Sequence, residues 1–346
     1  MTNKPSLGRG VLTVGIVGAG LIGTKRAAAI EKTGRGKLVA VADVDFARAT
    51  ALAEKYGAEA MREWKDLIAR DDIAIVIIAV PNVFAPKIAI AALRAGKDIL
   101  CEKPFGRNGK EAKTMLDAAK KAKRMIKVGF NHRFHAGVLK AHELWESGAI
   151  GKVMFIRARY GHGGRPGMEK EWRFDKKISG GGELLDQGVH IIDLARWFCG
   201  EFDTAYGLAQ TKFWKTKLDD NAFALLRNKR TTVSFHVSTT NWRNIFSLEI
   251  FGDTGYLQID GKGGSYGEEV LLHGKRNPGA APDITVFKFE GGDMSWEREW
   301  EHFADVLATG KKKLCGDMVD GLRANEIVDA LYRSSHEHRE VRLPKF

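Results

Sequence analysis

The chain has 346 residues, of which 44% are hydrophobic and 28% charged, and its formal net charge is +12 at pH 7. This length allows two domains with separate cores, and the composition is ordinary for a soluble protein. No apolar run approaches the roughly 20 residues of a membrane-spanning helix, so we expect no membrane partner. The segment Met1–Gly10 lacks the apolar part of a secretory signal, and we expect it to be a loose tail.

The cysteines and the basic runs narrow the class of protein further. Cys101, Cys199 and Cys315 form no Cys-x-x-Cys pair, which predicts neither a disulfide framework nor a metal site and favours a cytoplasmic location. Basic runs at Lys120–Arg124 and Lys311–Lys313 fit a solvated surface, or a field that attracts an anionic substrate such as a nucleotide sugar. No nucleic-acid motif accompanies them, so we do not expect nucleic acid as a partner.

A glycine-rich motif follows the first apolar run, Thr13–Val17. Within Gly18-Ala19-Gly20-Leu21-Ile22-Gly23, the first glycine permits a tight turn, the second lets a pyrophosphate approach, and the third allows a helix to pack on a strand. The helical pattern over 21–33 leaves the N–H groups of Leu21 and Ile22 free for phosphate. The motif therefore predicts dinucleotide binding.

Asp43 ends the next apolar run, 20 residues after Gly23. A carboxylate at this place accepts a hydrogen bond from the ribose 2′-hydroxyl and repels a 2′-phosphate. Val44 and Asp45 supply no cation beside it, so NAD is favoured over NADP, although Arg48 nearby keeps NADP open.

Residues 10–131 alternate short apolar runs with helical patterns, which predicts a Rossmann dinucleotide-binding domain with a parallel sheet covered on both faces. The expected strands are Thr13–Val17, Leu38–Ala42, Ile73–Val80, Asp98–Cys101 and Ile126–Phe130. The expected helices span 21–33, 46–56, 86–95 and 109–122.

Residues 132–346 have a different pattern, with alternating strands between turns, and predict an α+β domain for substrate binding and oligomerisation. We expect a mostly antiparallel sheet with one solvated face. The expected strands are Lys152–Tyr160, Thr204–Lys212, Ala222–Leu226, Thr231–Ser238, Phe246–Phe251 and Tyr256–Ile259. The expected helices span 136–147, 187–198, 296–308 and 317–335, and Gly261–Gly267 and Asn277–Pro282 are expected loops.

Polar segments follow three of the expected parallel strands, namely Pro81-Asn82, Glu102-Lys103-Pro104 and Asn131-His132-Arg133. Ligands of open α/β sheets bind outside the carboxyl ends of the strands, so these segments should meet the glycine turn in one cleft. A lysine there can polarise a substrate oxygen, although Lys103 also fits plain surface.

The second chemical candidate is the pair Asp186 and His190, which follows the glycines Gly180–Gly182. Four residues apart on a helix, they share a face, and the carboxylate can orient an imidazole that accepts the proton of an alcohol. A helix cap and a hydrogen-bonded core histidine are the structural alternatives. Upstream, Arg165, Trp172 and Arg173 can reach substrate from a loop, or Trp172 simply anchors that loop.

Together these residues resemble the Gfo/Idh/MocA oxidoreductases over nearly the whole chain. The resemblance rests on the glycine motif, Glu102-Lys103-Pro104, Asp186 with His190, and further pieces in the same order: Pro81-Asn82, Ala95-Gly96-Lys97, Val128-Gly129-Phe130-Asn131, Arg133, Gly148-Ala149-Ile150-Gly151 and Ser179–Gly182. It implies an open-faced C-terminal sheet that mediates a homo-oligomer, a dimer or tetramer, and a cis Lys103–Pro104 bond. Val83-Phe84-Ala85-Pro86 departs from the family pattern, in which many members carry a histidine.

The same resemblance implies site roles. It makes Lys103, Asp186 and His190 catalytic and substrate-contacting. The expected cofactor contacts are Gly18, Gly20, Leu21, Ile22, Gly23, Asp43, Pro81, Asn82, Glu102, Lys103 and Asn131. The remaining expected substrate contacts are Asn131, Arg165, Trp172 and Arg173.

The sequence therefore predicts an NAD-dependent dehydrogenase that acts on a secondary alcohol of a sugar, an inositol or a nucleotide sugar. One alternative is a redox-neutral enzyme that eliminates or hydrolyses a sugar through transient oxidation by tightly held NAD. A non-catalytic NAD-binding sensor is the other alternative.

Overall fold

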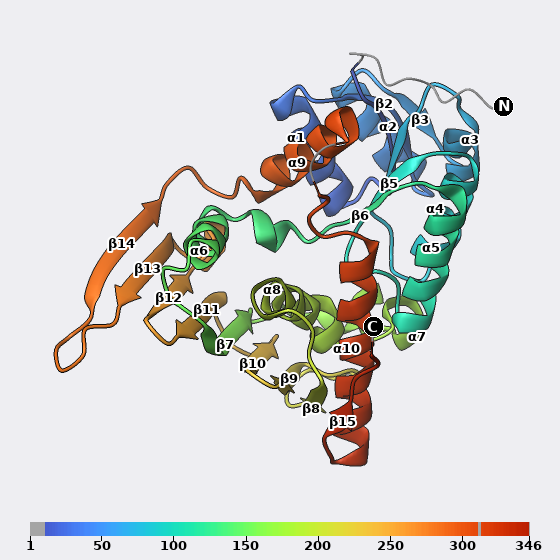
Figure 1. Ribbon diagram of the computed structural model, residues 1–346. Helices are drawn as coiled ribbons and strands as arrows, with labels where there is room; N and C mark the ends of the chain where they lie inside the picture. Colours follow the sequence, from blue (N-terminus) through green and yellow to red (C-terminus); the bar gives the residue numbers. More distant parts are fainter. Residues whose placement is uncertain (1–10, 311–312, 346) are drawn as a thin grey trace.

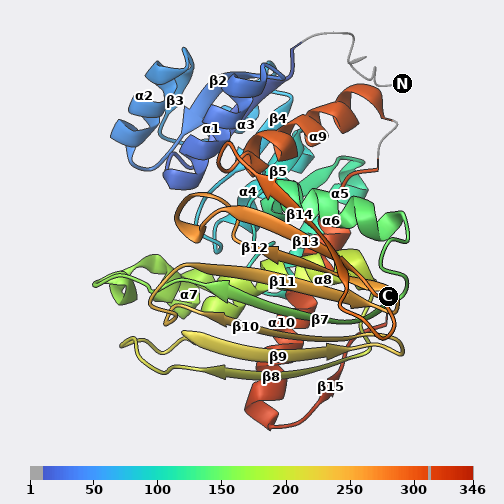
Figure 2. The ribbon, with the colours of Figure 1, turned by 90° about the vertical axis from the view of Figure 1, so that its left-hand side faces the viewer.

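The computed structural model describes residues 11–310 and 313–345, so the expected tail Met1–Gly10 and two lysines of the basic run, Lys311 and Lys312, lie outside the described residues. Two sheets with their helices lie one above the other, the first containing β1–β6 and the second β7–β15 (Figures 1 and 2). None of the helices in the described ranges combines the length and apolarity that crossing a bilayer requires.

The N-terminal sheet is fully parallel, with the strand order β3-β2-β1-β4-β5-β6 of a Rossmann fold. Its strands are β1 (Thr13–Val17), β2 (Lys37–Ala42), β3 (Glu59–Met61), β4 (Ile75–Ile78), β5 (Asp98–Cys101) and β6 (Ile126–Val128). Its helices are α1 (Leu21–Thr33), α2 (Phe46–Lys55), α3 (Trp64–Ala69), α4 (Ala85–Arg94) and α5 (Gly109–Ala122). Every residue of β4 and β5 is buried, because helices cover both faces.

The second sheet has nine strands in the order β14-β13-β12-β11-β7-β10-β9-β8-β15, and only the β7–β10 pair is parallel. Its strands are β7 (Val153–Gly161), β8 (Thr204–Gln210), β9 (Asn221–Arg227), β10 (Thr232–Ser238), β11 (Ile245–Gly252), β12 (Gly255–Asp260), β13 (Glu269–Lys275), β14 (Asp283–Phe289) and β15 (Val341–Arg342). The accompanying helices are α6 (Ala136–Glu146), α7 (Lys176–Ser179), α8 (Val189–Cys199), α9 (Ser295–Thr309) and α10 (Met318–Glu337).

One face of this sheet is covered and the other is open. The helices α6, α8 and α10 contact the strands from one side, and in Figure 2 the strands lie in front of them. In β9, Ala222, Ala224 and Leu226 are buried while Phe223 and Leu225 are exposed, which is the alternation of a half-covered strand. The predicted fold class, a Rossmann domain followed by a mostly antiparallel open-faced sheet, is confirmed.

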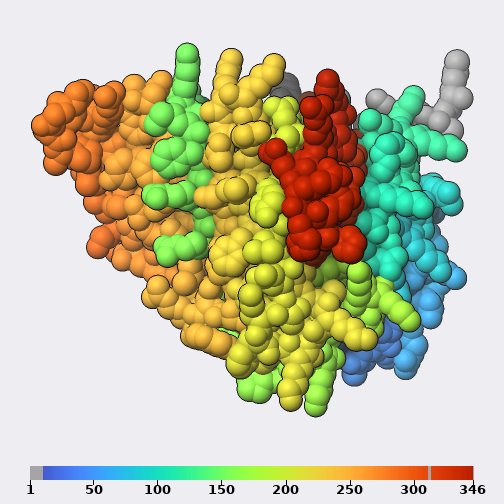
Figure 3. All heavy atoms as spheres, turned by 90° about the horizontal axis from the view of Figure 1, so that it is seen from below, coloured from blue at the N-terminus to red at the C-terminus, as the bar shows by residue number. Residues whose placement is uncertain are grey.

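The helices α9 and α10, near the end of the chain, pack against the Rossmann domain and connect it to the second domain. Trp300 and Phe303 of α9 are buried in the same hydrophobic cluster as Ile16 of β1 and Ile30 of α1, so this helix packs on the Rossmann sheet. The helix α10 contacts both α5 and β8. In Figure 3 its atoms separate those of the second sheet from those of the Rossmann domain.

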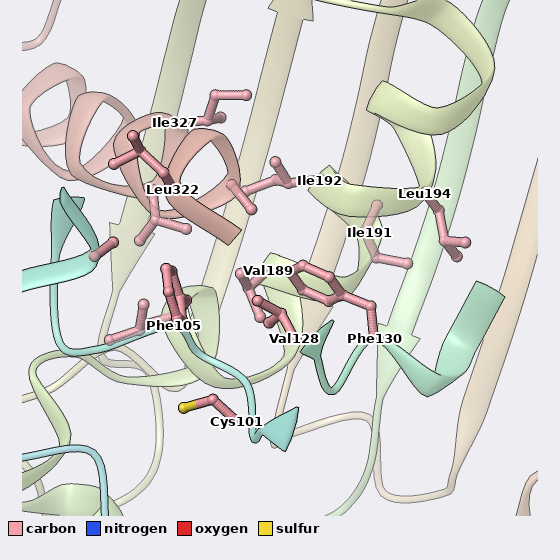
Figure 4. Close-up of a cluster of buried hydrophobic side chains, with 14 of the residues drawn as sticks. Cys101, Phe105, Val128, Phe130, Val189, Ile191, Ile192, Leu194, Leu322 and Ile327 are labelled. Carbon is pink, nitrogen blue, oxygen red and sulfur yellow. The ribbon is translucent and has the colours of Figure 1, made fainter. Parts of the chain in front are cut away.

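A hydrophobic junction joins the strand ends of the Rossmann sheet to the second domain (Figure 4). Phe105, just after β5, and Phe130, just after β6, are fully buried. They belong to the same cluster as Val189 and Ile192 of α8 and Leu322 of α10. Because the core is continuous here, the carboxyl ends of the parallel strands lie directly against the start of α8.

A buried ion network lies behind this junction. Arg26 of α1 pairs with Glu102 and with Glu299 of α9 at 2.6 Å each, and Lys127 of β6 pairs with Glu299 at 2.6 Å. Burial alone would raise the pKa of Glu299, but Lys127 and Arg26 outweigh it and lower that pKa. Removing one member of such a network leaves buried charge without compensation.

We therefore expect Glu299→Gln to lower the free energy of unfolding by about 3–5 kcal/mol, because Arg26 and Lys127 stay buried without their shared carboxylate. The matched control is Asp305→Asn on the same helix, whose partner Arg35 is partly exposed, with an expected loss below about 1 kcal/mol. Urea unfolding followed by circular dichroism measures both variants. Equal losses in the two variants would show that the buried network adds nothing special.

Candidate active site

The glycine turn between β1 and α1 is open on one side only. Gly18 has φ +103°, and a Cβ there would lie 2.2 Å from the carbonyl oxygen of Ala79. A Cβ on Gly23 would lie 1.9 Å from the carbonyl oxygen of Gly18, whereas one on Gly20 would meet nothing within 4 Å. The helix starts at Leu21 with no side-chain cap, so its first N–H groups face this open side. The cradle fits a dinucleotide pyrophosphate.

Asp43 lies directly against this turn. Its carboxylate accepts hydrogen bonds from the backbone N–H of Ala19 at 2.7 Å and of Asp45 at 2.9 Å. Arg48, the cation that kept NADP open, forms an ion pair with Asp45 at 3.0 Å. Arg48, the cation that the sequence offered for a 2′-phosphate beside Asp43, is therefore already paired with Asp45.

Three predicted cofactor contacts have their side chains bound within the chain. Asn82 donates to the carbonyl of Ser179 at 2.8 Å, and Asn131 donates to the hydroxyl of Ser295 at 2.8 Å. The carboxylate of Glu102 is paired with Arg26, as described above. With Pro81, these residues line the strand ends as expected, and their contacts with the cofactor stay a prediction.

Lys103 follows β5 after one residue and precedes a cis bond to Pro104. Its ammonium donates to the Asp186 carboxylate at 2.6 Å and to the Asp186 carbonyl at 2.7 Å. Asp186 lies in a π-helical turn, Leu184–Gly188, just before α8. Burial would raise its pKa, but Lys103 and then Arg173 outweigh burial and lower the pKa of Asp186. The ion pair joins the two domains at the carboxyl ends of the parallel strands.

His190 lies in the first turn of α8, and its ring stacks on that of His132 with centroids 3.7 Å apart. Burial lowers the pKa of His190 well below its usual value, and the field of Lys103 lowers it further. The imidazole is therefore neutral and can accept a proton. Its Nδ1 is buried with no hydrogen-bond partner among the described residues.

The contacts differ from those expected in one respect. Asp186 and His190 were expected to share a helix face, with the carboxylate orienting the imidazole, but the described partners of Asp186 are Lys103 and Arg173, and His190 contacts His132 instead. A π-helical turn carries more residues per turn than an α-helix, so the four-residue spacing does not align the two side chains. The sequence marked His132 only by its place after a strand.

A buried ion pair holds His132 in place. The neighbouring Arg133 makes a two-pronged contact with Asp193 of α8, at 2.7 Å and 2.5 Å. Burial alone would lower the pKa of Arg133, but Asp193 and Asp320 outweigh it and raise that pKa. The pair fixes the turn Asn131–Phe134 against α8, and therefore His132 against His190.

The loop before the glycine triplet approaches the same ion pair. Arg173 Nε lies 3.8 Å from the Asp186 carboxylate, and its guanidinium stacks on Trp172 at 4.6 Å from the ring centroid. Arg165 is mostly exposed and pairs with Glu171. The structure thus brings Arg173, stacked on Trp172, close to Asp186. The described ion pair of Arg165 is with Glu171 of the same loop.

Sequence reasoning missed a second lysine and two tyrosines near His190. The ammonium of Lys262 lies 4.0 Å from the ring centroid of Tyr266 and 5.3 Å from that of Tyr160. Tyr160 also contacts the rings of His132 and His190. Lys262 lies in a segment identified only as a glycine-containing loop, so no sequence signal marked it. In the described ranges, no group of three or more His, Cys, Asp and Glu side chains could hold a metal ion.

Comparison with known families agrees with this geometry. Residues 12–130 match the model of an oxidoreductase family with an NAD-binding Rossmann fold, and residues 138–258 match the GFO/IDH/MocA C-terminal domain. The chain belongs to the Gfo/Idh/MocA family. The predicted family is confirmed.

Several curated relatives of this Gfo/Idh/MocA protein are dehydrogenases. It is 28% identical to D-glucoside 3-dehydrogenase of Escherichia coli over 99% of each chain. It is 28% identical to inositol 2-dehydrogenase of Rubrobacter xylanophilus over 93% of this chain and 90% of the relative. Levoglucosan dehydrogenase of Pseudarthrobacter phenanthrenivorans is 36% identical, but that match spans only 58% of this chain and 54% of the relative.

Solved structures agree in fold. Levoglucosan dehydrogenase in complex with NADH and levoglucosan superposes with a TM-score of 0.89 at 26% identity, covering 97% of this chain and 100% of the other. The complex of levoglucosan dehydrogenase with NADH gives a TM-score of 0.90 at 25% identity over the same shares. These matches confirm the predicted cofactor, NAD, and the predicted enzyme class, a dehydrogenase acting on CH–OH groups.

The open side of the turn makes a testable prediction. Gly20→Ala places a methyl group where the cradle is empty, at a backbone φ of −74° that alanine adopts readily, so we expect a folded protein whose Kd for NAD rises by about tenfold or more. Isothermal titration calorimetry measures the Kd.

Gly23→Ala serves as the contrast, because its methyl group would collide with the Gly18 carbonyl and lower the melting temperature as well. An unchanged Kd for NAD in Gly20→Ala would place the pyrophosphate away from this turn.

Proposed function

We propose that the protein is an NAD-dependent dehydrogenase that oxidises, or in reverse reduces, a secondary alcohol carbon of a polyhydroxylated ring. The observation that carries the proposal is the ion pair of Lys103 with Asp186 beside the neutral imidazole of His190, at the edge of the sheet that holds the glycine turn. Oxidation of an alcohol needs a proton acceptor and a cation near the same oxygen, and this cleft offers both.

Each residue then has a distinct task. Held by the glycine turn and Asp43, NAD would supply the acceptor for the hydride of the carbinol C–H bond. His190 accepts the hydroxyl proton as the O–H bond breaks, and Lys103 stabilises the negative charge that develops on that oxygen. Asp186 is the positioning residue for Lys103, because its carboxylate and its carbonyl both receive the ammonium.

The substrate class follows from chemistry that the relatives share. Levoglucosan, a glucoside and an inositol are all rings that carry adjacent secondary hydroxyl groups. We therefore propose a sugar, an inositol or a nucleotide sugar as substrate. Trp172 and Arg173, next to Asp186, are the proposed contacts for a ring face and a ring oxygen, and Asn131 and Arg165 complete the proposed contacts.

Loss of either the cation or the base should slow the reaction strongly without abolishing cofactor binding. We expect Lys103→Met and His190→Asn each to lower kcat by on the order of a hundredfold or more, with the Kd for NAD little changed. The absorbance of NADH during turnover of a panel of sugars, inositols and UDP-sugars measures kcat. The controls Lys113→Met and His336→Asn, at exposed positions, should turn over like the parent protein.

Full activity in both site variants would refute these roles. The two alternatives give other results in the same assay. Product formation with nicotinamide retained and no free NADH would indicate the redox-neutral enzyme, and tight NAD binding with no reaction across the panel would indicate a sensor.

We also propose a homo-oligomer, a dimer or tetramer, formed through the open face of the second sheet. Tyr206, Phe223 and Leu225 are exposed on β8 and β9, and this apolar surface would be covered by the same face of a second copy. The three cysteines are free thiols, which supports the cytoplasmic location that is part of this proposal.

The double change Phe223→Lys and Leu225→Lys should convert the oligomer to a monomer, because four added charges would face each other across each two-fold contact. Sedimentation equilibrium measures the mass. Lys229→Glu, exposed in the turn after β9, should keep the parent mass. A parent chain that sediments as a monomer at all concentrations would contradict the proposal.

A further inference from the structure

The loop between β12 and β13 directs one lysine toward the base. Lys262 lies between Gly261 at φ +70° and Gly263 at φ +81°. A Cβ on Gly261 would lie 2.0 Å from the carbonyl oxygen of Glu268, and the N–H of Gly263 donates to the carbonyl of Gly267 at 2.9 Å. The loop therefore closes on itself in a conformation that glycine favours, and the lysine between the glycines packs over two aromatic rings.

The two lysines of the site differ in their partners. Lys103 forms an ion pair with Asp186 at 2.6 Å. For Lys262, no hydrogen bond or ion pair is found with any residue in 11–310 or 313–345, and only the rings of Tyr160 and Tyr266 lie under its ammonium. The nearby carboxylate of Asp293 already accepts from the backbone N–H of Ser295 at 3.0 Å and from the indole of Trp296 at 3.1 Å. Lys262 is thus a cation without a direct counter-ion.

Its electrostatic surroundings disfavour an extra positive charge. Burial lowers the pKa of Lys262 to about 8, with Asp293 opposing and Lys25 and Lys103 adding to the fall. The titratable groups that act on Lys262, or on which it acts, are Lys25, Lys103, His132, His135, Tyr160, His162, His190, Tyr266, Glu269 and Asp293.

The positive charge of Lys262 also opposes the proposed chemistry. Its field lowers the pKa of His190, so it disfavours the imidazolium that forms when His190 takes the substrate proton. An anion bound beside Lys262 would cancel this field and make the base stronger. Burial raises the pKa of Tyr266 to about 12, so its phenol keeps a proton and can donate to the same anion.

We propose that Lys262 binds a carboxylate of the substrate, so that the preferred substrates are ring sugars that carry an acid group, such as uronates. The proposal rests on the proposed function and names the substrate class of that site. A single ammonium with a neutral phenol beside it matches one negative charge. The carboxylate contributes twice, because it binds the free cation and restores the basicity of His190.

The test compares acids with their neutral partners, using glucuronate and glucose, galacturonate and galactose, and methyl glucuronide and methyl glucoside. With saturating NAD, the parent enzyme should show kcat/KM higher for the acid by about tenfold or more. Lys262→Gln should reduce this acid-to-neutral ratio by at least about tenfold, chiefly through KM for the acid, and Lys262→Arg should retain most of it. Lys275→Gln, an exposed lysine at the end of β13, is the matched control and should keep the parent ratio.

The pH dependence provides an independent readout. A lysine is charged below its pKa, so the acid-to-neutral ratio of the parent enzyme should fall as pH rises through about 8. The ratio should stay high in Lys262→Arg, since arginine keeps its charge, and should be flat in Lys262→Gln.

Three outcomes would overturn the proposal. The first is a parent enzyme that prefers the neutral member of every pair. The second is an acid-to-neutral ratio of kcat/KM that does not change in Lys262→Gln. The third is a KM for NAD that rises in Lys262→Gln by the same factor with every substrate. The last result would assign Lys262 to the cofactor. Failure of the proposed function is distinguishable, because then neither member of any pair would reduce NAD.

Discussion

The placement of the candidate site residues depends on hydrophobic contacts between their neighbours in the chain. Cys101 and Phe105 flank the Lys103 segment, Val189 and Ile191 flank His190, and all four side chains belong to one buried cluster (Figure 4). Packing at core density leaves little freedom to residues whose chain neighbours are fixed in this way. Apolar packing therefore fixes the two segments that carry Lys103 and His190 relative to each other.

Whether a buried charged side chain has a counter-ion then distinguishes structural from ligand-binding groups. In the cluster behind the cleft, Arg26 and Lys127 share the carboxylate of Glu299, and their contribution is structural. At the candidate site, Asp186 holds Lys103 in place, whereas the ammonium of Lys262 lies over aromatic rings. Burial lowers the pKa of His190 and so favours its neutral imidazole, the form that the proposed proton transfer requires.

Local signals account for the parts of the fold that the sequence predicted. The glycine turn, β1 and α1 have the expected bounds, because turn glycines and helical periodicity act over a few residues. Among the described residues, four strands (β3, β13, β14 and β15) and two short helices (α3 and α7) were missed. β3 and α3 are too short to show a period, and β13 and β14 form an outer hairpin, with β14 mostly exposed and therefore lacking a buried apolar face.

The sequence predicted several residues of the candidate site but not which of them contact one another, because those contacts join distant segments. Lys103 and Asp186 are 83 positions apart, and their contact requires a π-helical turn that no local pattern indicates. His132 and Lys262 have no motif, and their places beside His190 and Tyr266 depend on contacts between distant segments. A lysine in an ordinary surface loop would be solvated, and here burial without a carboxylate partner makes the same residue a site for an anion.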